Sequence, residues 1–155
     1  MNYVIHGLAI DLFRPLFALD ETSLRLRGIE RRIADTKPGY PCRVSLQDAE
    51  PGETLLLLSF EHHAVDRAYR SSGPIFVREA AQSTCVLRND IPEQQRSRLL
   101  SVRAYDSHGA MHLAEVVEGT SLEALIARLF GDSRVACLHV HNARRGCYAC
   151  RVERG

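Results

Sequence analysis

Residues 135–153 read VACLHVHNARRGCYACRVE, and they predict a β-hairpin that carries the clearest group of reactive side chains in the chain. Two runs of alternating apolar and polar residues flank the loop 142–146, as expected for paired strands. The pleat puts His139, His141 and Cys147 on one polar face. The opposite, apolar face is predicted to pack on the core and contains Leu138, Val140, Tyr148, Cys150 and Val152.

The expected register brings this polar face together. If the loop closes the hairpin directly, His141 lies opposite Cys147 and His139 lies opposite Ala149. Opposed residues have Cβ atoms roughly 5 Å apart, which allows side-chain contact. A thiol beside an imidazole can have a lowered pKa and act as a nucleophile, with histidine as the base. We therefore predict catalytic roles for His139, His141 and Cys147, against the alternative that the histidines have a hydrogen-bonded structural role.

The same segment suggests a zinc site as an alternative. Two histidines and a CxxC pair are ligands that suit tetrahedral zinc. Cys147 and Cys150 point to opposite faces of a regular strand, so a site of His139, His141, Cys147 and Cys150 requires the strand to bend. A site without Cys150 needs no bend and leaves an open position. We do not favour zinc as the cofactor, and we expect Cys150 to pack as a small buried hydrophobe.

The middle of the chain supplies further candidates. Residues Leu55–His63 predict a buried strand with polar residues at its end, and His62 is a fourth candidate catalytic residue. Arg70, Ser71 and Ser72 lie in a predicted loop that can hold an anion through its guanidinium and hydroxyl groups. The alternatives are a buried structural histidine and a turn with an exposed arginine.

Arg43 and Asn142 complete the candidate ligand-binding residues. If the middle and C-terminal segments form one cleft, then His62 and His141 must open onto a common concavity. The predicted cleft is therefore a polar one of histidine, arginine and cysteine, suited to an anionic ligand.

The remaining patterns indicate an α+β fold: a mainly antiparallel sheet of hairpins with two or three short helices packed on it. A single domain over residues 1–155 is expected. Further strands are predicted over 2–13, 75–79, 99–106 and 110–117. Helices are predicted over Asp20–Gly28, Asp90–Arg98 and Thr120–Phe130, the last beginning with a capping box of Thr120 and Glu123.

Composition narrows the function classes. The formal net charge is +1, which argues against a nucleic-acid partner. Purely apolar runs such as Leu55–Leu58 are far too short for a membrane span, and the N-terminus does not resemble an export signal, so we expect a cytoplasmic location. The five cysteines are odd in number and scattered, which indicates free thiols rather than disulfides. The oligomeric state is left open.

Several separated blocks resemble a known family, domain of unknown function 1203 (DUF1203). The matching blocks are Pro38–Arg43, Asp48–Glu53, Glu61-His62, Tyr69–Arg78, Tyr105-Asp106, His139–Ala143 and Gly146–Arg151. The resemblance covers almost the whole chain and implies a bacterial cytoplasmic protein. It implies no activity and no catalytic residue.

We therefore expect a small-molecule-binding protein or enzyme with a polar cleft for an anionic ligand. A zinc-binding module that uses the C-terminal HxH and CxxC motifs is one alternative. A non-catalytic interaction domain is another, since a short exposed strand such as 75–79 can pair with a partner's strand.

Overall fold

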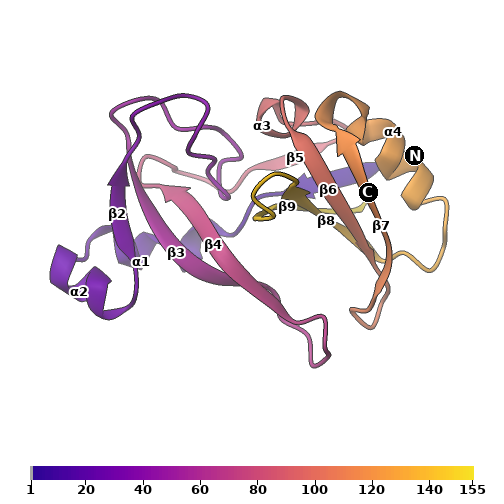
Figure 1. The fold of residues 1–155 in the computed structure, drawn as a ribbon, viewed down its shortest axis with the longest axis horizontal. Helices are drawn as coiled ribbons and strands as arrows, with labels where there is room; N and C mark the ends of the chain where they lie inside the picture. Colours follow the sequence, from indigo (N-terminus) through magenta and orange to yellow (C-terminus); the bar gives the residue numbers. More distant parts are fainter. Residues whose placement is uncertain (1) are drawn as a thin grey trace.

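The computed structural model describes residues 2–155, which form two antiparallel sheets with short helices (Figure 1). The large sheet has the strand order β5-β1-β9-β8-β6-β7, and the small sheet has the order β2-β3-β4. The strands are β1 (Tyr3–His6), β2 (Glu30–Ile33), β3 (Thr54–His63), β4 (Ser71–Arg78), β5 (Val86–Arg88), β6 (Leu99–Tyr105), β7 (Met111–Glu118), β8 (Cys137–Asn142) and β9 (Tyr148–Arg154). The helices are α1 (Arg14–Phe17), α2 (Glu21–Leu26), α3 (Glu93–Arg96) and α4 (Leu122–Leu129), with 3₁₀ turns at Ile10–Leu12 and Gly119–Ser121.

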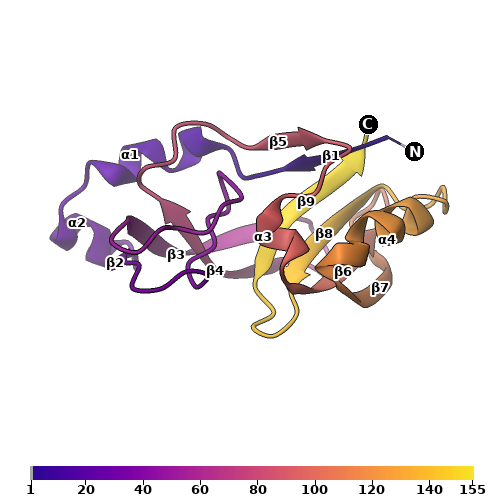
Figure 2. The ribbon, with the colours of Figure 1, turned by 90° about the horizontal axis from the view of Figure 1, so that it is seen from above.

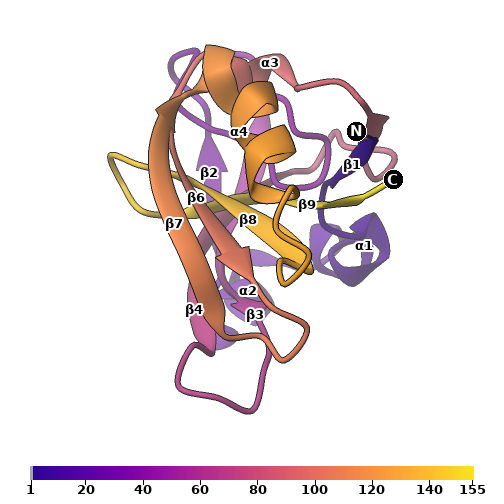
Figure 3. The same ribbon diagram turned by 90° about the vertical axis from the view of Figure 1, so that its right-hand side faces the viewer.

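The α+β class predicted from the sequence is confirmed. Helix α4 packs across one face of the large sheet (Figure 3). Its apolar stripe is buried, as the helical spacing predicts, and consists of Leu122, Leu125, Ile126 and Leu129. The stripe meets the inward side chains of β6, β8 and β9, which include Val102, Val140 and Val152. This contact leaves the opposite face of these three strands free to meet the small sheet.

The start of α4 differs from the sequence prediction. Thr120 lies inside the 3₁₀ turn, and Ser121 occupies the N-cap position without a side-chain capping bond. The Glu123 carboxylate instead accepts a hydrogen bond from the Tyr3 hydroxyl at 3.2 Å. The predicted capping box is therefore absent, because a contact from β1 takes the side chain that would complete it.

The small sheet packs against the N-terminal helices, which lie along its side in Figure 2. Asp20 caps α2 as predicted, since its carboxylate accepts a bond of 2.7 Å from the Ser23 amide. Phe13 at the N-cap of α1 and Leu24 within α2 are buried in clusters with side chains of the small sheet. None of the helices in residues 2–155 is long and apolar enough to cross a membrane.

Several element boundaries also differ from expectation. The first strand ends at His6, residues 7–9 have no regular secondary structure, and Ile10–Leu12 form a 3₁₀ turn. The loop predicted around Ser71 and Ser72 is the beginning of β4, where Ser71 pairs with His63 across the small sheet. Helix α3 follows Pro92 rather than Asp90, whose carboxylate accepts a bond from the Ile91 amide. Strands β2 and β5 were not predicted, since each has only three or four residues.

The two sheets meet where the end of β3 lies against β8, β9 and the β6–β7 turn. The His63 ring donates from Nε2 to the Gly109 carbonyl at 2.8 Å and joins β3 to that turn. On the other side, Arg98 binds both carboxylate oxygens of Asp48 in a partly buried ion pair. The His63 contact holds the far end of β3 over the face of the large sheet that α4 does not cover, and the Arg98 contact joins the loop before β3 to the start of β6.

Candidate functional site

Three imidazoles meet at this junction of the two sheets. His62 comes from β3, and His139 and His141 come from β8. One ring nitrogen from each residue lies within 4.8 Å of the other two. The ring centroids of His62 and His141 are 5.1 Å apart, and those of His62 and His139 are 6.2 Å apart. We call this group the three-histidine cluster.

Strand geometry explains how the cluster forms. Residues two apart on a strand point to the same side, so His139 and His141 share one face while Leu138 and Val140 enter the core. On β3 the pairing with β4 shifts between Phe60 and His63. Such irregularities re-aim side chains. Here both His62 and His63 contact the ring of His139, although neighbouring residues on a regular strand point apart.

Several ring nitrogens of the cluster lack a protein partner within residues 2–155. The His141 ring donates from Nδ1 to the Gly146 carbonyl at 2.9 Å, and its Nε2 is buried without a partner. Neither ring nitrogen of His139 has a partner, although the residue is only 1% exposed. Nδ1 of His62 is also buried and unpaired. Buried polar atoms without partners are costly and uncommon, so the cluster is a place where a ligand would be stabilising.

Burial keeps the three imidazoles neutral. It lowers the pKa of His139 to about 2 and the pKa values of His62 and His141 to about 4. Nearby positive charge acts in the same direction, since the Arg103 guanidinium also lowers the pKa of both His62 and His141. At neutral pH each ring therefore has a lone pair that can bind a ligand.

Tyrosine rings surround the cluster. The Tyr148 ring stacks on His62 and meets the edges of His139 and His141. On the other side, Tyr105 lies against His63 and His139. Burial raises the pKa of both tyrosines, so their phenols stay protonated. The cluster thus lies in an aromatic and largely water-excluded setting.

Residues 39–154 match a protein family described as "Protein of unknown function (DUF1203)". The chain belongs to the DUF1203 family. All three histidines of the cluster lie inside the matched region, and β1, α1, α2 and β2 precede it. No curated protein and no solved structure matches the chain.

The cysteines of this DUF1203 protein do not join the cluster. Pairing between β8 and β9 shifts at Val140, so that Val140 opposes Cys150 and His141 opposes Tyr148. The expected pairing of His141 with Cys147 is therefore wrong. Cys147 lies in the turn before β9, where its sulfur accepts a bond of 3.4 Å from Asn142 Nδ2.

The same shift moves Tyr148 from the predicted apolar face to the histidine face. Cys150 is completely buried in the main core, as predicted, and burial raises its pKa to about 12. The residues whose ligand atoms lie close enough to share a metal ion are His62, His139 and His141, so neither Cys147 nor Cys150 is among them. His62 is the third ligand, where the sequence predicted a cysteine.

In this DUF1203 protein, the positive charge of the predicted anion-binding segment Arg70–Ser72 is balanced by a carboxylate of the same chain. The Arg70 guanidinium binds both carboxylate oxygens of Glu61 at 2.7 and 3.1 Å, in an exposed position. The Ser71 hydroxyl donates to the Tyr69 carbonyl at 2.8 Å. No hydrogen bond of residues 2–155 involves the Ser72 side chain, which lies on β4. These groups do not converge on the cluster.

Arg43 has a structural position rather than an open one. It is 2% exposed and donates from Nε to the Tyr148 carbonyl at 2.6 Å and from Nη1 to the Pro41 carbonyl. Burial lowers its pKa, while the neighbouring Cys147 acts in the opposite direction. Arg43 thereby fixes the start of β9, next to the ring that stacks on His62.

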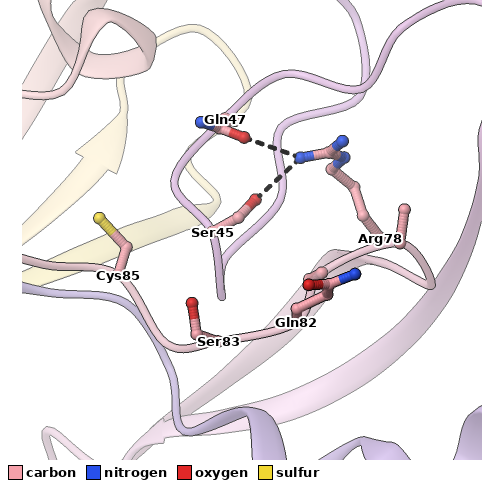
Figure 4. A pocket seen from close by; sticks show the side chains of 8 residues that line it. Ser45, Gln47, Arg78, Gln82, Ser83 and Cys85 are labelled. Atoms are coloured by element: carbon pink, nitrogen blue, oxygen red, sulfur yellow. Dashed lines mark hydrogen bonds between the residues drawn. The ribbon is translucent and has the colours of Figure 1, made fainter.

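A separate surface pocket, drawn in Figure 4, has polar walls without an unbalanced charge. Its Arg78 donates to Gln47 at 2.9 Å and to Ser45 at 3.4 Å. The same guanidinium binds Glu53 in a partly buried ion pair. The pocket therefore offers less to a charged ligand than the three-histidine cluster does.

Sequence reasoning missed His63, Tyr105, Tyr148 and Arg103 as neighbours of the cluster. The alternation predicted over 99–106 does place Arg103 and Tyr105 on one face of their strand. That signal was present, but the order of the strands is needed to show that this face adjoins the histidines of β8. For Tyr148 no sequence signal existed, because the register shift is not visible in the alternation.

Proposed function

We propose that this DUF1203 protein binds one divalent transition-metal ion through His62, His139 and His141, and that the ion activates a water molecule or a small-molecule ligand. The observation that carries the proposal is the approach of three neutral imidazoles whose buried nitrogens lack partners. Three protein ligands with a fourth position open are the arrangement of catalytic zinc sites. Function as a metalloenzyme is favoured over a purely structural metal site, since no fourth ligand from residues 2–155 joins the group.

The ring nitrogens need only a small adjustment to hold such an ion. Zinc–nitrogen bonds of about 2.0–2.1 Å place ligand nitrogens roughly 3.3 Å apart in a tetrahedral site. The three ligand nitrogens now lie within 4.8 Å of one another, so each side chain must shift by about 1 Å. Rotation of the imidazoles can supply such a shift. A bound ion would give a partner to nitrogens of His139 and His141 that now have none.

The hydrogen bond of His141 supports the same assignment. Metal-ligating histidines commonly donate their second ring N–H to a carbonyl or carboxylate, which fixes the tautomer. His141 donates from Nδ1 to Gly146, so its Nε2 carries the lone pair. An all-imidazole ligand set suits zinc, copper, nickel, cobalt or iron better than magnesium or calcium.

Metal stoichiometry tests the proposal directly. The full chain, purified without a metal-affinity tag and stripped with a chelator, would be dialysed against zinc or cobalt and analysed for bound metal. We expect one equivalent for the wild type and a loss of at least tenfold in affinity for His139→Gln and His62→Gln. His108→Gln is the matched control, because His108 is exposed at the tip of the β6–β7 turn.

Two results would overturn the metal site. One is a wild-type chain that binds no metal above the level of a protein without histidine clusters. The other is equal binding by the wild type and by a correctly folded His139→Gln variant, with folding checked by circular dichroism.

A further inference from the structure

Arg103 is a cation that lies beside the three-histidine cluster without a counter-ion. It lies on β6, where it is paired in register with His139 on the neighbouring strand β8. Directly opposed residues project from the same face of a sheet, so the Arg103 side chain and the His139 ring share the face that meets β3. The position is partly buried rather than exposed.

No carboxylate within residues 2–155 forms an ion pair with Arg103. The nearest acidic residues along the surrounding strands have other partners: Glu61 binds Arg70, and Glu153 binds Arg151 and His6. On the side of β7, Glu115 binds Arg128. Partly buried arginines elsewhere in the chain have acidic partners, as Arg78 has Glu53 and Arg98 has Asp48.

The other titratable groups at this face do not balance the charge. The rings that line this face are the cluster imidazoles, His63 and the phenols of Tyr105 and Tyr148, and none of them is a carboxylate. A metal ion at the cluster would add further positive charge. The face is therefore electropositive, next to a His139 ring that is buried and without a partner.

We propose that Arg103 binds the oxyanion group of a small-molecule ligand whose adjacent polar atom occupies the open metal position. A guanidinium presents a planar pair of N–H donors that matches a carboxylate or a phosphate. The ligand class is thus a carboxylic acid or a phosphate ester, and Arg103 sets specificity while the ion polarises the neighbouring group. This inference rests on the metal site of the proposed function.

Cobalt makes both steps visible in one experiment. Addition of Co²⁺ to the metal-free chain reports metal binding through visible absorption bands. Inorganic phosphate or acetate is then added, and the change in those bands reports the anion. We expect the wild type to respond with a saturable change, and the two anions show which oxyanion the site prefers.

Arg103→Met separates the inference from the proposed function. The variant should bind Co²⁺ at least as well as the wild type, since a repelling charge is removed, and its affinity for the preferred anion should fall about tenfold or more. Arg88→Met is the matched control, because Arg88 is exposed on β5 and makes no ion pair within residues 2–155. Equal anion affinities in wild type and Arg103→Met would overturn the inference and leave the metal site intact.

If cobalt does not bind, the proposed metal site is overturned. Calorimetry of phosphate or acetate binding to the metal-free chain then tests the oxyanion site by itself. Binding heat that Arg103→Met loses and Arg88→Met keeps would still support the oxyanion site. Identical heats in all three proteins, or none in any, would overturn it.

Discussion

The imidazole of His62 lies flat against the phenol ring of Tyr148, with centroids 5.0 Å apart and planes within 7° of parallel. The two residues come from different sheets, His62 from the end of β3 and Tyr148 from the start of β9. The stacked pair therefore positions the only cluster member that the small sheet supplies. The position of the His62 ring in the cluster therefore depends on the Tyr148 ring that it stacks on.

Replacement of Tyr148 tests the stacking. Tyr148→Leu should weaken metal binding by about tenfold, the usual scale when a group that orients a metal ligand is lost. Tyr148→Phe keeps the ring and should bind metal as the wild type does, because no hydrogen bond of the described chain involves the hydroxyl. Metal titration of both variants measures the difference. Equal losses in the two would show that the ring itself has no positioning role.

The metal-free protein should lose stability as the pH falls below about 6.5. Unfolded histidine has a pKa of about 6.5, whereas the folded values are about 4 for His62 and His141 and about 2 for His139. Between these values the unfolded chain binds protons that the folded chain excludes, so protonation favours unfolding. Above about pH 7.5, where unfolded histidine is almost wholly neutral as well, the cluster contributes no pH dependence. Urea midpoints between pH 7.5 and 4.5, with chelator present, measure the slope.

His139→Leu is the matched variant for this pH dependence. It removes the most deeply buried imidazole and substitutes an apolar side chain of similar size. We expect a shallower fall in the urea midpoint between pH 6.5 and 4.5 than in the wild type. A slope that does not change would mean that His139 takes up protons as readily in the folded chain as in the unfolded chain, contrary to the burial argument.

Gly109 should tolerate no side chain. Its φ is +80°, and a Cβ atom there would lie 2.6 Å from a methyl group of Val65. Gly109→Ala should therefore lose about 1–2 kcal/mol for the backbone conformation and a further 1–3 kcal/mol for the steric overlap. Gly52→Ala is the control, since Gly52 has a φ of +92° and no neighbour within 4 Å. Urea unfolding should rank the two variants in that order, and equal losses would contradict the contact with Val65.

Arg43 and Arg70 should differ sharply in their effect on stability. Arg43→Met leaves two buried carbonyls, of Tyr148 and Pro41, without their donor, at a cost of about 1–3 kcal/mol each. Arg70→Met removes an exposed, solvent-screened ion pair with Glu61 and should change stability far less than Arg43→Met does. Urea unfolding of both variants checks the contrast. A small loss for Arg43→Met would contradict its role in fixing the start of β9.

The sequence predicts the elements of the site better than it predicts their registers. The alternation around His139 and His141 correctly places both side chains on one face, because the period of a strand is fixed. The shift at Val140 adds a residue to β9 and turns Tyr148 toward the histidines, which reverses the predicted face of that residue. A single extra residue reverses the face of every side chain that precedes it in the strand. No residue type in this segment indicates that the strand contains one.

The approach of His62 to His141 was expected only on the condition that the middle and C-terminal segments meet. The structure places these rings 5.1 Å apart. The reason lies in long-range packing, because α4 covers the other face of β6, β8 and β9 and the end of β3 lies against the histidine face. Such an arrangement depends on the order of strands in the sheet, which local patterns do not encode.

The position of β1 has a practical consequence for work on this family. The matched region begins at residue 39, so β1 precedes it. In the large sheet, however, β1 is the second strand and pairs with β5 on one side and β9 on the other. A gene fragment that encodes only the matched region would lack β1. The backbone groups of β9 would then have no partner along one edge, and β5 would have no strand to join it to the sheet. The unit of sequence similarity is thus smaller than the unit of folding, and recombinant work should keep the N-terminal residues.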